Sequence, residues 1–285
     1  MANNYNKVKG ESFPMQSTLS TTDQSQPINN AVPHIYLSRG RGGCARAGEL
    51  AAIAVVIDAL RASTTIAALF TQGIARVSVV AKVEDAFALG KTLPDAVLIG
   101  ERGGERLPGF QFGNSPLEVL ASPRLDGRTA IFTSSNGAQR LTACRHAAHT
   151  LVGSVANATQ LAAWVRQTAE VEGRPVVLIA AGQYPDEAFI SPEDEVTGAY
   201  LAARIGLPIS AESHAAFRHW EHETILHGLT LVFRASRHAQ RLMEIGYGND
   251  VSFCARTDTC PALPMVTGPI QLHGRQIGVE VKLRP

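Results

Sequence analysis

The segment AIAVVIDALRASTTIAALFTQ, residues 52–72, decides the fold class. It begins with an apolar run at 52–57, continues through a short polar segment that contains Asp58 and Arg61, and ends in an Ala-rich stretch at 63–72. An apolar run of this length, rich in β-branched residues, predicts a buried strand, and the stretch after it predicts a helix. The segment is therefore a strand followed by a helix.

The same succession recurs along most of the chain. Short apolar runs lie at 76–80, 96–99, 129–132, 150–152 and 175–180, and helical stretches follow most of them, at 83–89, 137–146, 158–170 and 192–205. Strands this apolar belong in a sheet that is covered on both faces. The alternation predicts an α/β fold, with a mainly parallel sheet in a layered α/β/α arrangement.

The two ends of the chain differ from this middle part. Residues 1–30 are rich in Asn, Gln, Ser and Thr and lack apolar periodicity, so we expect a flexible polar tail before a folded domain over residues 31–285. Beyond Leu207 the alternation stops: residues 213–242 are typical of two helices, and residues 250–283 of strands and turns. This change indicates a boundary between two subdomains near residue 207.

Composition excludes several classes of protein. The 285 residues include 26 Lys and Arg against 25 Asp and Glu, so the net charge of +1 offers no field that would attract nucleic acid or a membrane. The longest apolar run, residues 50–57, is far shorter than the roughly 20 residues that span a bilayer. The 4 cysteines form no CxxC pair, and the first residues contain no apolar signal stretch. We therefore expect a cytoplasmic protein without nucleic-acid or membrane partners, and the sequence is compatible with a homo-oligomer.

Polar side chains gather just after the predicted strands, where ligands bind in an open α/β sheet. Such residues are also ordinary helix caps, but five successive strand ends carry acids, arginines or hydroxyls, which favours a binding site. The candidates for binding an anion are Arg61, Ser63, Thr64, Arg102, Asn114, Ser115, Thr133, Ser134, Asn136 and Gly137.

Acids lie at the same strand ends, namely Asp58, Glu101, Glu193 and Asp194. Carboxylate oxygens are the ligands that Mg²⁺ prefers, and a bound cation explains why acids would share a site with an anionic substrate. Glu193 and Asp194 have a second explanation, because SPED is also a good helix start, with proline in the first turn and acids that suit the helix dipole. The sequence leaves these two explanations open.

Motifs of several known hydrolase mechanisms are absent from the sequence. It contains no P-loop, no GxSxG nucleophile elbow, no cysteine followed six positions later by arginine, and no second acid two positions after Asp58. The histidines between residues 214 and 227 form no HExxH zinc motif and are typical of an exposed helix.

Taken together, the motifs resemble the 2-phosphosulfolactate phosphatase family, also called ComB, over residues 55–266. The resemblance rests on VVIDALRASTT, IGERGGERLPGFQFGNSPLE, FTSSNGAQRL, VGSVANATQLA, SPEDEVTGA, SRHAQRL and DVSFCARTD, which occur in the family's order. It implies a Mg²⁺-dependent phosphatase of layered α/β/α fold that releases sulfolactate, an intermediate on a route to coenzyme M. Carried over by position, the residues around substrate and metal are Asp58, Arg61, Ser63, Glu101, Arg102, Asn114, Ser115, Thr133, Asn136 and Asp194. SRHAQRL departs from the family pattern, which has a glycine after the histidine.

Two hypotheses of different classes follow. In the first, the chain is a phosphatase for a small phosphorylated anion, in which Arg61 or Arg102 offsets phosphate charge and Arg237 is a further cationic contact. Asp58 is then either the nucleophile or a Mg²⁺ ligand that orients water, and the missing second acid favours the ligand role. In the second, the chain is a non-catalytic anion-binding or regulatory protein. The retained acids argue against it, since a pure anion receptor gains nothing from carboxylates beside its ligand.

Overall fold

The computed structural model describes residues 1–2, 32–184, 186 and 189–284. The predicted polar tail, residues 1–30, lies outside the described residues except for its first two positions. The strands are β1 (Ile35–Arg39), β2 (Ile53–Ile57), β3 (Arg76–Val80), β4 (Val97–Arg102), β5 (Glu105–Arg106), β6 (Thr129–Thr133), β7 (His149–Val152), β8 (Val176–Ala180), β9 (Pro264–Leu272) and β10 (Arg275–Leu283). The α-helices are α1 (Gly40–Glu49), α2 (Ala62–Thr71), α3 (Val83–Thr92), α4 (Pro116–Leu120), α5 (Gly137–Ala143), α6 (Ala158–Glu172), α7 (Pro192–Ile205), α8 (His214–Ala235), α9 (Arg237–Glu244) and α10 (Gly248–Cys254).

The strands form one 10-stranded sheet in the order β1-β8-β2-β7-β9-β10-β3-β6-β4-β5. The strands β1, β8, β2 and β7 are parallel to one another, and so are β3, β6 and β4. The hairpin β9–β10 joins these two parallel halves and is antiparallel to its neighbours on both sides. Every residue of β2 and β8 is buried, as their apolar sequences predict. The predicted α/β fold with a mainly parallel sheet is confirmed.

The hairpin reverses the strand direction between the two halves. Because β7, β9, β10 and β3 are paired antiparallel in succession, a flat sheet would place the carboxyl ends of the two halves on opposite edges. The ends nevertheless meet, since the N–H of Gly137, after β6, donates to the carboxylate of Asp58, after β2, over 2.6 Å. A twist of about 20–25° between neighbouring strands accumulates across the sheet and turns the two sets of ends toward each other.

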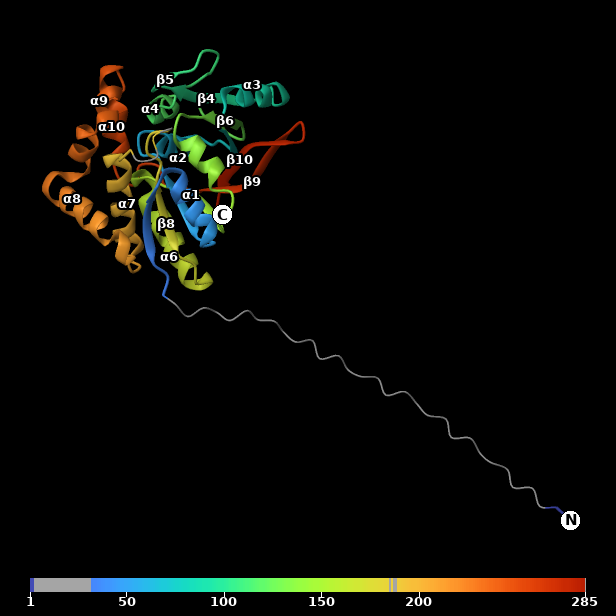
Figure 1. The fold of residues 1–285 in the computed structure, drawn as a ribbon. Helices are drawn as coiled ribbons and strands as arrows, with labels where there is room; N and C mark the ends of the chain where they lie inside the picture. Colours follow the sequence, from blue (N-terminus) through green and yellow to red (C-terminus); the bar gives the residue numbers. More distant parts are fainter. Residues whose placement is uncertain (3–31, 185, 187–188, 285) are drawn as a thin grey trace.

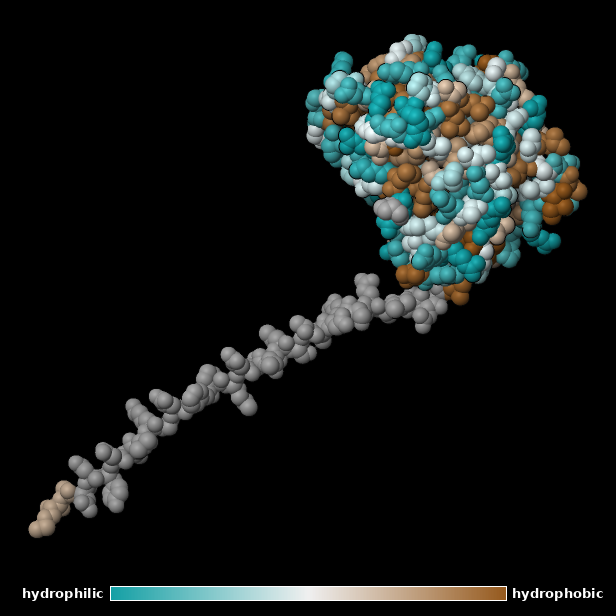
Figure 2. Space-filling view, turned by 180° about the vertical axis from the view of Figure 1, so that it is seen from behind, coloured by the Kyte–Doolittle hydropathy of each residue, from teal (hydrophilic) through white to brown (hydrophobic). Residues whose placement is uncertain are grey.

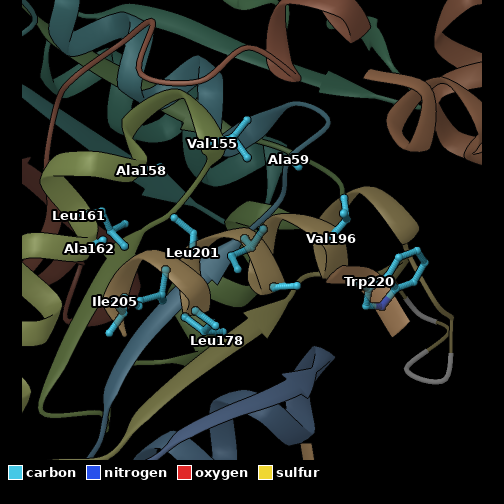
Figure 3. Close-up of a cluster of buried hydrophobic side chains, with 14 of the residues drawn as sticks. Ala59, Val155, Ala158, Leu161, Ala162, Leu178, Val196, Leu201, Ile205 and Trp220 are labelled. Atoms are coloured by element: carbon cyan, nitrogen blue, oxygen red, sulfur yellow. The ribbon is translucent and has the colours of Figure 1, made fainter. Parts of the chain in front are cut away.

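Alternate residues of the central strands face different helices, as the period of a strand requires. Val55 of β2 and Leu178 of β8 belong to a cluster with α6 and α7, whereas Val56 and Val177 belong to a second cluster with α1, α2 and α5. In the first cluster, Figure 3 shows α7 with its apolar side chains directed at α6 and at β8. These contacts hold the start of α7, and with it the acids of SPEDE, against the sheet.

Helix α2 is buried almost all round, from Ala62 to Phe70. A helix with no exposed face lies in the interior of a domain, and α2 packs against α4, α5 and β9. The helix begins four positions after Asp58. Because α2 is fixed by its packing, it gives the short segment that carries Asp58 and Arg61 a rigid support.

The helices α7 to α10 gather on one flank of the sheet (Figure 1). The two helices predicted over residues 213–242 are confirmed as α8 and α9. The strand and turn prediction for residues 250–283 holds for β9 and β10 but is wrong for α10. Val251 and Cys254, three positions apart, are both buried on one face of that helix, and Asp250 lies in its first turn. The subdomain boundary near residue 207 stays a prediction.

The surface seen in Figure 2 mixes polar and apolar patches, with apolar residues at the edge that α8 forms. Ile225, Leu226 and Leu231 of that helix are 76%, 58% and 58% exposed. Within the described ranges, we find no helix with the length and apolar character needed to cross a bilayer.

Candidate active site

Asp58 lies where the first turns of two helices meet. Its Oδ2 accepts the N–H of Gly137 at 2.6 Å, its Oδ1 accepts the more distant N–H of Ala62 at 3.4 Å, and its own N–H donates to Oγ of Ser63 at 3.0 Å. Gly137 has to be glycine, because a Cβ there would lie 2.7 Å from Oδ2 of Asp58. Helix N-termini attract negative charge, and the carboxylate of Asp58 lies at the N-termini of both α2 and α5.

Burial raises the pKa of Asp58 to about 6, although His238 and the N–H donors lower it, and the charge of Glu101 adds to the increase. Catalytic groups are often carboxyl groups that border a cavity and have a shifted pKa.

Glu101 ends β4 and is held by the loop that follows β6. Its Oε1 accepts the N–H of Ser135 at 2.7 Å, and its Oε2 accepts the N–H of Gly104 at 2.8 Å and the hydroxyl of Ser135 at 3.2 Å. Gly104 has a φ of +91°, which a side chain would strain, so the tight turn after β4 requires glycine. Asp58 and Glu101 thus come from the two different halves of the sheet.

Arg61 is bound into a buried network. Its Nη1 donates to Oδ2 of Asp250 at 2.7 Å, its Nη2 donates to the carbonyl of Gly104 at 2.5 Å, and its guanidinium lies 4.0 Å from the ring centre of Tyr247. Oγ of Ser115 donates to the other oxygen of Asp250 at 2.8 Å. The network joins the loop after β2 to the turn after β4, to α4 and to α10.

Arg102 lies behind Glu101. Its Nη1 donates to the carbonyl of Glu101 at 2.6 Å, and its Nη2 donates to the carbonyl of Ala81 at 3.2 Å and to Oγ1 of Thr133 at 3.0 Å. Burial lowers the pKa of Arg102, against the opposing effect of the charges of Glu101 and Glu84. The side chain therefore ties together the ends of β3, β4 and β6.

The first turn of α7 is buried although it is acidic. Asp194 accepts the N–H of Ala59 at 2.8 Å on one oxygen and the N–H of Gly182 at 3.1 Å on the other. Burial, with the charges of Glu193 and Asp58, raises the pKa of Asp194 well above its usual value. The predicted helix start is confirmed, with Pro192 in its first turn. Asp194 in addition connects the loops that follow β2 and β8.

Glu193 is paired with a histidine of α9. Its Oε1 lies 3.3 Å from Nδ1 of His238, while its Oε2 is buried and has no hydrogen-bond partner in the described part of the chain. Desolvation lowers the pKa of His238, but the hydrogen bond to Glu193 and the charges of Glu193, Asp58 and Glu101 outweigh it, so the pKa is raised. The imidazole therefore favours its protonated form beside the acids.

A cavity of about 860 Å³ opens between these strand ends and α9. We call the side chains that line it the cavity wall. The predicted site residues on the wall are Asp58, Arg61, Glu101, Asn114 and Asn136. The remaining predicted residues lie behind it or in its support and, together with Asp250, we call them the supporting layer: Ser63, Thr64, Arg102, Ser115, Thr133, Ser134, Gly137, Glu193 and Asp194.

Arg237, which the sequence predicted as a further cationic contact, lines the cavity from α9. Other wall residues were outside the predicted set, among them His238 and Arg241 of α9, Ser135 and Gln183. Ser236 places the three α9 side chains, since its Oγ accepts the N–H of Ala239 at 3.1 Å and caps the helix. SRHAQRL was a visible motif, but only the fold shows that it reaches the acids. Ser135 could have been predicted from the sequence, because it is the one hydroxyl residue of TSSNG that the candidate set did not include.

The wall combines both signs of charge. Asp58 and Glu101 line the same hollow as Arg237, His238 and Arg241. Asn114 adds an unusual group, because its Oδ1 is buried without a hydrogen-bond partner among the described residues. Such a wall can hold an anion through its cations, while its acids act on a proton, a water molecule or a metal ion.

Two acids on the wall also fit Mg²⁺. In the described ranges, no group of three or more His, Cys, Asp or Glu side chains is arranged to hold a metal ion by itself. Mg²⁺ does not need such a cage, because it is usually bound through one or two carboxylates, with substrate phosphate and water filling its other positions. The donor set of Asp58 and Glu101 matches that pattern.

Comparison with known proteins identifies relatives over most of the chain. A family model for 2-phosphosulpholactate phosphatase matches residues 44–269. A Gloeobacter violaceus protein named Probable 2-phosphosulfolactate phosphatase is 36% identical over 219 residues, which cover 75% of this chain and 88% of the relative. A protein of the same name from Carboxydothermus hydrogenoformans is 34% identical over 214 residues, covering 74% of this chain and 84% of the relative.

Proposed function

The chain belongs to the 2-phosphosulfolactate phosphatase family, a family of phosphoric monoester hydrolases, and on that premise we propose that it hydrolyses 2-phosphosulfolactate or a closely related phosphorylated 2-hydroxy acid. The products are inorganic phosphate and a 2-hydroxy acid, which for the named substrate is sulfolactate. The observation that carries the proposal is the cavity wall, in which Asp58 and Glu101 line the same hollow as the cations of α9.

The substrate needs more than one cationic contact, because it carries a phosphate, a carboxylate and a sulfonate. Arg237 and Arg241 are exposed at the cavity, one turn apart on α9, and are the natural partners for the carboxylate and the sulfonate. Arg61 has its Nη atoms engaged by Asp250 and Gly104, so we assign it a fixed positive charge beside the phosphate. Arg102 then acts indirectly, by holding the backbone of Glu101.

We propose Mg²⁺ as the cofactor, held by Asp58 and Glu101 from the two halves of the sheet. When bound, Mg²⁺ neutralises charge on the phosphate oxygens, which is the main requirement of phosphoryl transfer. Asp194 and Glu193 stand one layer behind, and Asp194 fixes the loop that carries Asp58. The raised pKa of Asp58, which comes mainly from burial and in smaller part from the charge of Glu101, supports the proposal, because a bound cation would favour the ionised carboxylate.

The chain's own groups complete the reaction. Asp58 orients a water molecule for attack on phosphorus, and the bond between phosphorus and the ester oxygen breaks. The departing alkoxide is a poor leaving group and needs a proton, which His238 supplies from its imidazolium form. Glu193 holds the imidazole at Nδ1, so the opposite ring nitrogen is the one free to donate.

The experiment is a phosphate-release assay on the purified full chain. The substrates are 2-phosphosulfolactate and 2-phospholactate, which lacks the sulfonate, each with Mg²⁺ or with EDTA. We expect release from 2-phosphosulfolactate only with Mg²⁺, and at least about tenfold lower kcat/KM without the sulfonate, or about 1.4 kcal/mol. Release that persists in EDTA would refute the cofactor. Binding of either ester without release would favour the alternative, a non-catalytic anion-binding protein.

The cellular setting is part of the same proposal. All 4 cysteines are free and buried, which suits a reducing cytoplasm. There we place the enzyme on a route to coenzyme M, acting on a small anion and without nucleic acid or membrane as partner. Whether it works as a homo-oligomer can be read from size-exclusion chromatography with light scattering in the same preparation.

A further inference from the structure

A second cleft lies beside the active-site cavity, on the side of α5 that faces the β9–β10 hairpin. It encloses about 540 Å³ between the residues after β3, the outer face of α5 and the start of β10. Nothing in the proposed reaction uses it. Since it is bounded by different elements from the cavity, it is a candidate site of its own.

The second cleft is strongly basic. Among the described residues, its lining holds one acid, Asp85, and the cations Arg41, Lys82, Arg140, Arg145 and Arg275. This excess is local, because the net charge of the whole chain is only +1. A hollow lined by one sign of charge focuses the field on whatever enters it.

Part of this charge is open to a ligand. Asp85 is engaged by Nη2 of Arg275 at 2.6 Å. Lys82 and Arg145 are exposed, and neither has a carboxylate within ion-pair distance among the described residues. Two such cations in the lining of one hollow suit a ligand that carries more than one anionic group.

The walls of the second cleft are fixed by hydrogen bonds. Nε2 of Gln139 donates to the carbonyl of Ala81 at 2.9 Å, which joins α5 to the end of β3. Arg140 is only 1% exposed, and its Nε donates to the carbonyl of Ala181 at 2.9 Å. A preorganised wall of this kind loses little conformational freedom when a ligand binds.

Tyr184 separates the second cleft from the active-site cavity and lines both. Its N–H donates to Oδ1 of Asn136 at 2.8 Å, at the residue that precedes α5. The two hollows are therefore neighbours that share Tyr184. The cavity wall combines acids and cations, whereas the described lining of the second cleft has one acid and five cations.

We propose that the second cleft binds a small polyanion, a molecule with at least two phosphate, sulfonate or carboxylate groups, separately from the substrate. The cations that meet the ligand are Lys82 and Arg145, at a preformed hollow whose wall also contains Arg140 and the Arg275–Asp85 pair. It lies beyond the proposed reaction, and turnover does not require it to be filled.

The test is isothermal titration of the full chain with inorganic pyrophosphate in metal-free buffer of low ionic strength, with inorganic phosphate as the single-group probe. The variant Lys82→Glu/Arg145→Glu removes the open cations of the second cleft. Its matched control is Lys91→Glu/Arg218→Glu, which makes the same change of net charge at exposed cations outside both hollows. Arg237→Glu/Arg241→Glu tests the active-site cavity in the same way.

We expect pyrophosphate to bind the wild type, and phosphate to bind about tenfold more weakly. The second-cleft variant should weaken pyrophosphate binding by about tenfold or more, while the matched control and the active-site variant change it by less than about threefold. Turnover of the second-cleft variant should stay within about twofold of the wild type. If charge reversal prevents folding, Lys82→Gln/Arg145→Gln replaces it, with an expected loss of about threefold.

Three results would overturn the proposal. Absence of pyrophosphate binding to the wild type would remove the site. Equal weakening in the second-cleft variant and its matched control would mean attraction by overall charge only. Loss of binding in the active-site variant alone would place pyrophosphate in the active-site cavity. Each of these results leaves the phosphatase assay untouched, so the failure of one proposal is distinguishable from the failure of the other.

Discussion

The acids of the cavity wall and those of the supporting layer are equally buried but are held differently. Asp58 and Glu101 are 5% and 6% exposed, and Asp194 and Asp250 are 4% and 2% exposed. Both oxygens of Asp194 accept backbone N–H groups, and both oxygens of Asp250 are bound by side chains, Arg61 and Ser115. The wall acids also accept protein hydrogen bonds, yet they border the cavity. The degree of burial therefore does not distinguish the acids of the cavity wall from those of the supporting layer, whereas access to the cavity does.

The sharpest test of this difference is Asp58→Asn. We expect kcat to fall about a thousandfold, or about 4 kcal/mol, because the wall loses the charge that faces the substrate. The fold should persist, since an amide oxygen can still accept the N–H of Gly137. The measurement is phosphate release at saturating Mg²⁺. More than about a tenth of the wild-type rate would move Asp58 into the supporting layer.

The pH dependence of the unfolding free energy gives a second test of Asp58→Asn, independent of the activity assay. The folded-state pKa of about 6 lies above the unfolded value, so the protonated form favours folding and this contribution is lost as pH rises toward 6. In metal-free protein, Asp58→Asn should therefore gain stability over the wild type between about pH 4 and pH 6 and keep the gain above it. Urea unfolding at pH 4, 6 and 8 with EDTA checks this. A variant that is less stable at every pH would contradict it.

Asp250→Leu should have the opposite effect from Asp58→Asn, because it should mainly lower the unfolding free energy. It leaves Arg61, which is 2% exposed, with an uncompensated buried charge, and we expect a loss of about 3 kcal/mol of unfolding free energy. The matched control is Asp126→Ala, which breaks the exposed pair with Arg124 and should cost far less, because solvent screens a surface ion pair. Urea unfolding measures both. Arg61→Met/Asp250→Leu should recover part of the loss, and an equal cost for Asp250 and Asp126 would deny the network its role.

His238→Gln examines the contact between His238 of the wall and Glu193 of the supporting layer. Without the proton donor, kcat on an alkyl phosphate such as 2-phosphosulfolactate should fall about a hundredfold, or about 2.7 kcal/mol. On p-nitrophenyl phosphate, whose leaving group needs no proton, the fall should be less than about fivefold. Parallel kcat measurements on the two esters give the comparison. Equal losses would make His238 a structural or charge contact of Glu193 instead of a proton donor.

The smallest expected effect separates Glu101 from Asp194. Glu101→Gln should raise the Mg²⁺ concentration for half-maximal rate about tenfold, or about 1.4 kcal/mol, because a wall ligand loses its charge. Asp194→Asn should raise it less than about threefold and should act on kcat, through the loop that it holds. Mg²⁺ titrations of both variants check this. An Asp194→Asn shift as large as that of Glu101→Gln would make Asp194 a direct ligand.

Local patterns predicted most of the fold. The apolar runs after Leu50 became buried strands, and α7 begins at Pro192 as predicted, although the side chain of Ser191 makes no capping hydrogen bond. The helix α10 was missed because VSFC, four apolar or small residues in a row, has no period that separates strand from helix. Sheet order was also beyond the sequence, since the hairpin that joins the two halves pairs residues far from β3 and β7 along the chain.

The sequence predicted which residue types form the candidate site, but it predicted less well where their long side chains point. Residues after strands were expected to meet, and Asp58, Glu101 and Asn136 do line one cavity. Arg61 and Arg102 were expected to meet an anion, but the structure engages their guanidinium groups with Asp250 and with backbone carbonyls. Which way a long side chain turns depends on partners distant in sequence. The place of α9 depends on the packing of α8 and α10, which no local pattern encodes.

The position of β9–β10 has a consequence for how this protein is made. A ribosome releases residues 264–283 after every other strand, yet they occupy the middle of the sheet. Until then the nascent chain holds two half-sheets with open inner edges, and exposed edges invite pairing with other chains. Asp58 and Glu101 belong to different halves, so the cavity wall can be assembled only once the hairpin has docked. Stop codons upstream of β9 should therefore yield aggregation-prone, inactive chains, even though every residue of the cavity has been synthesised.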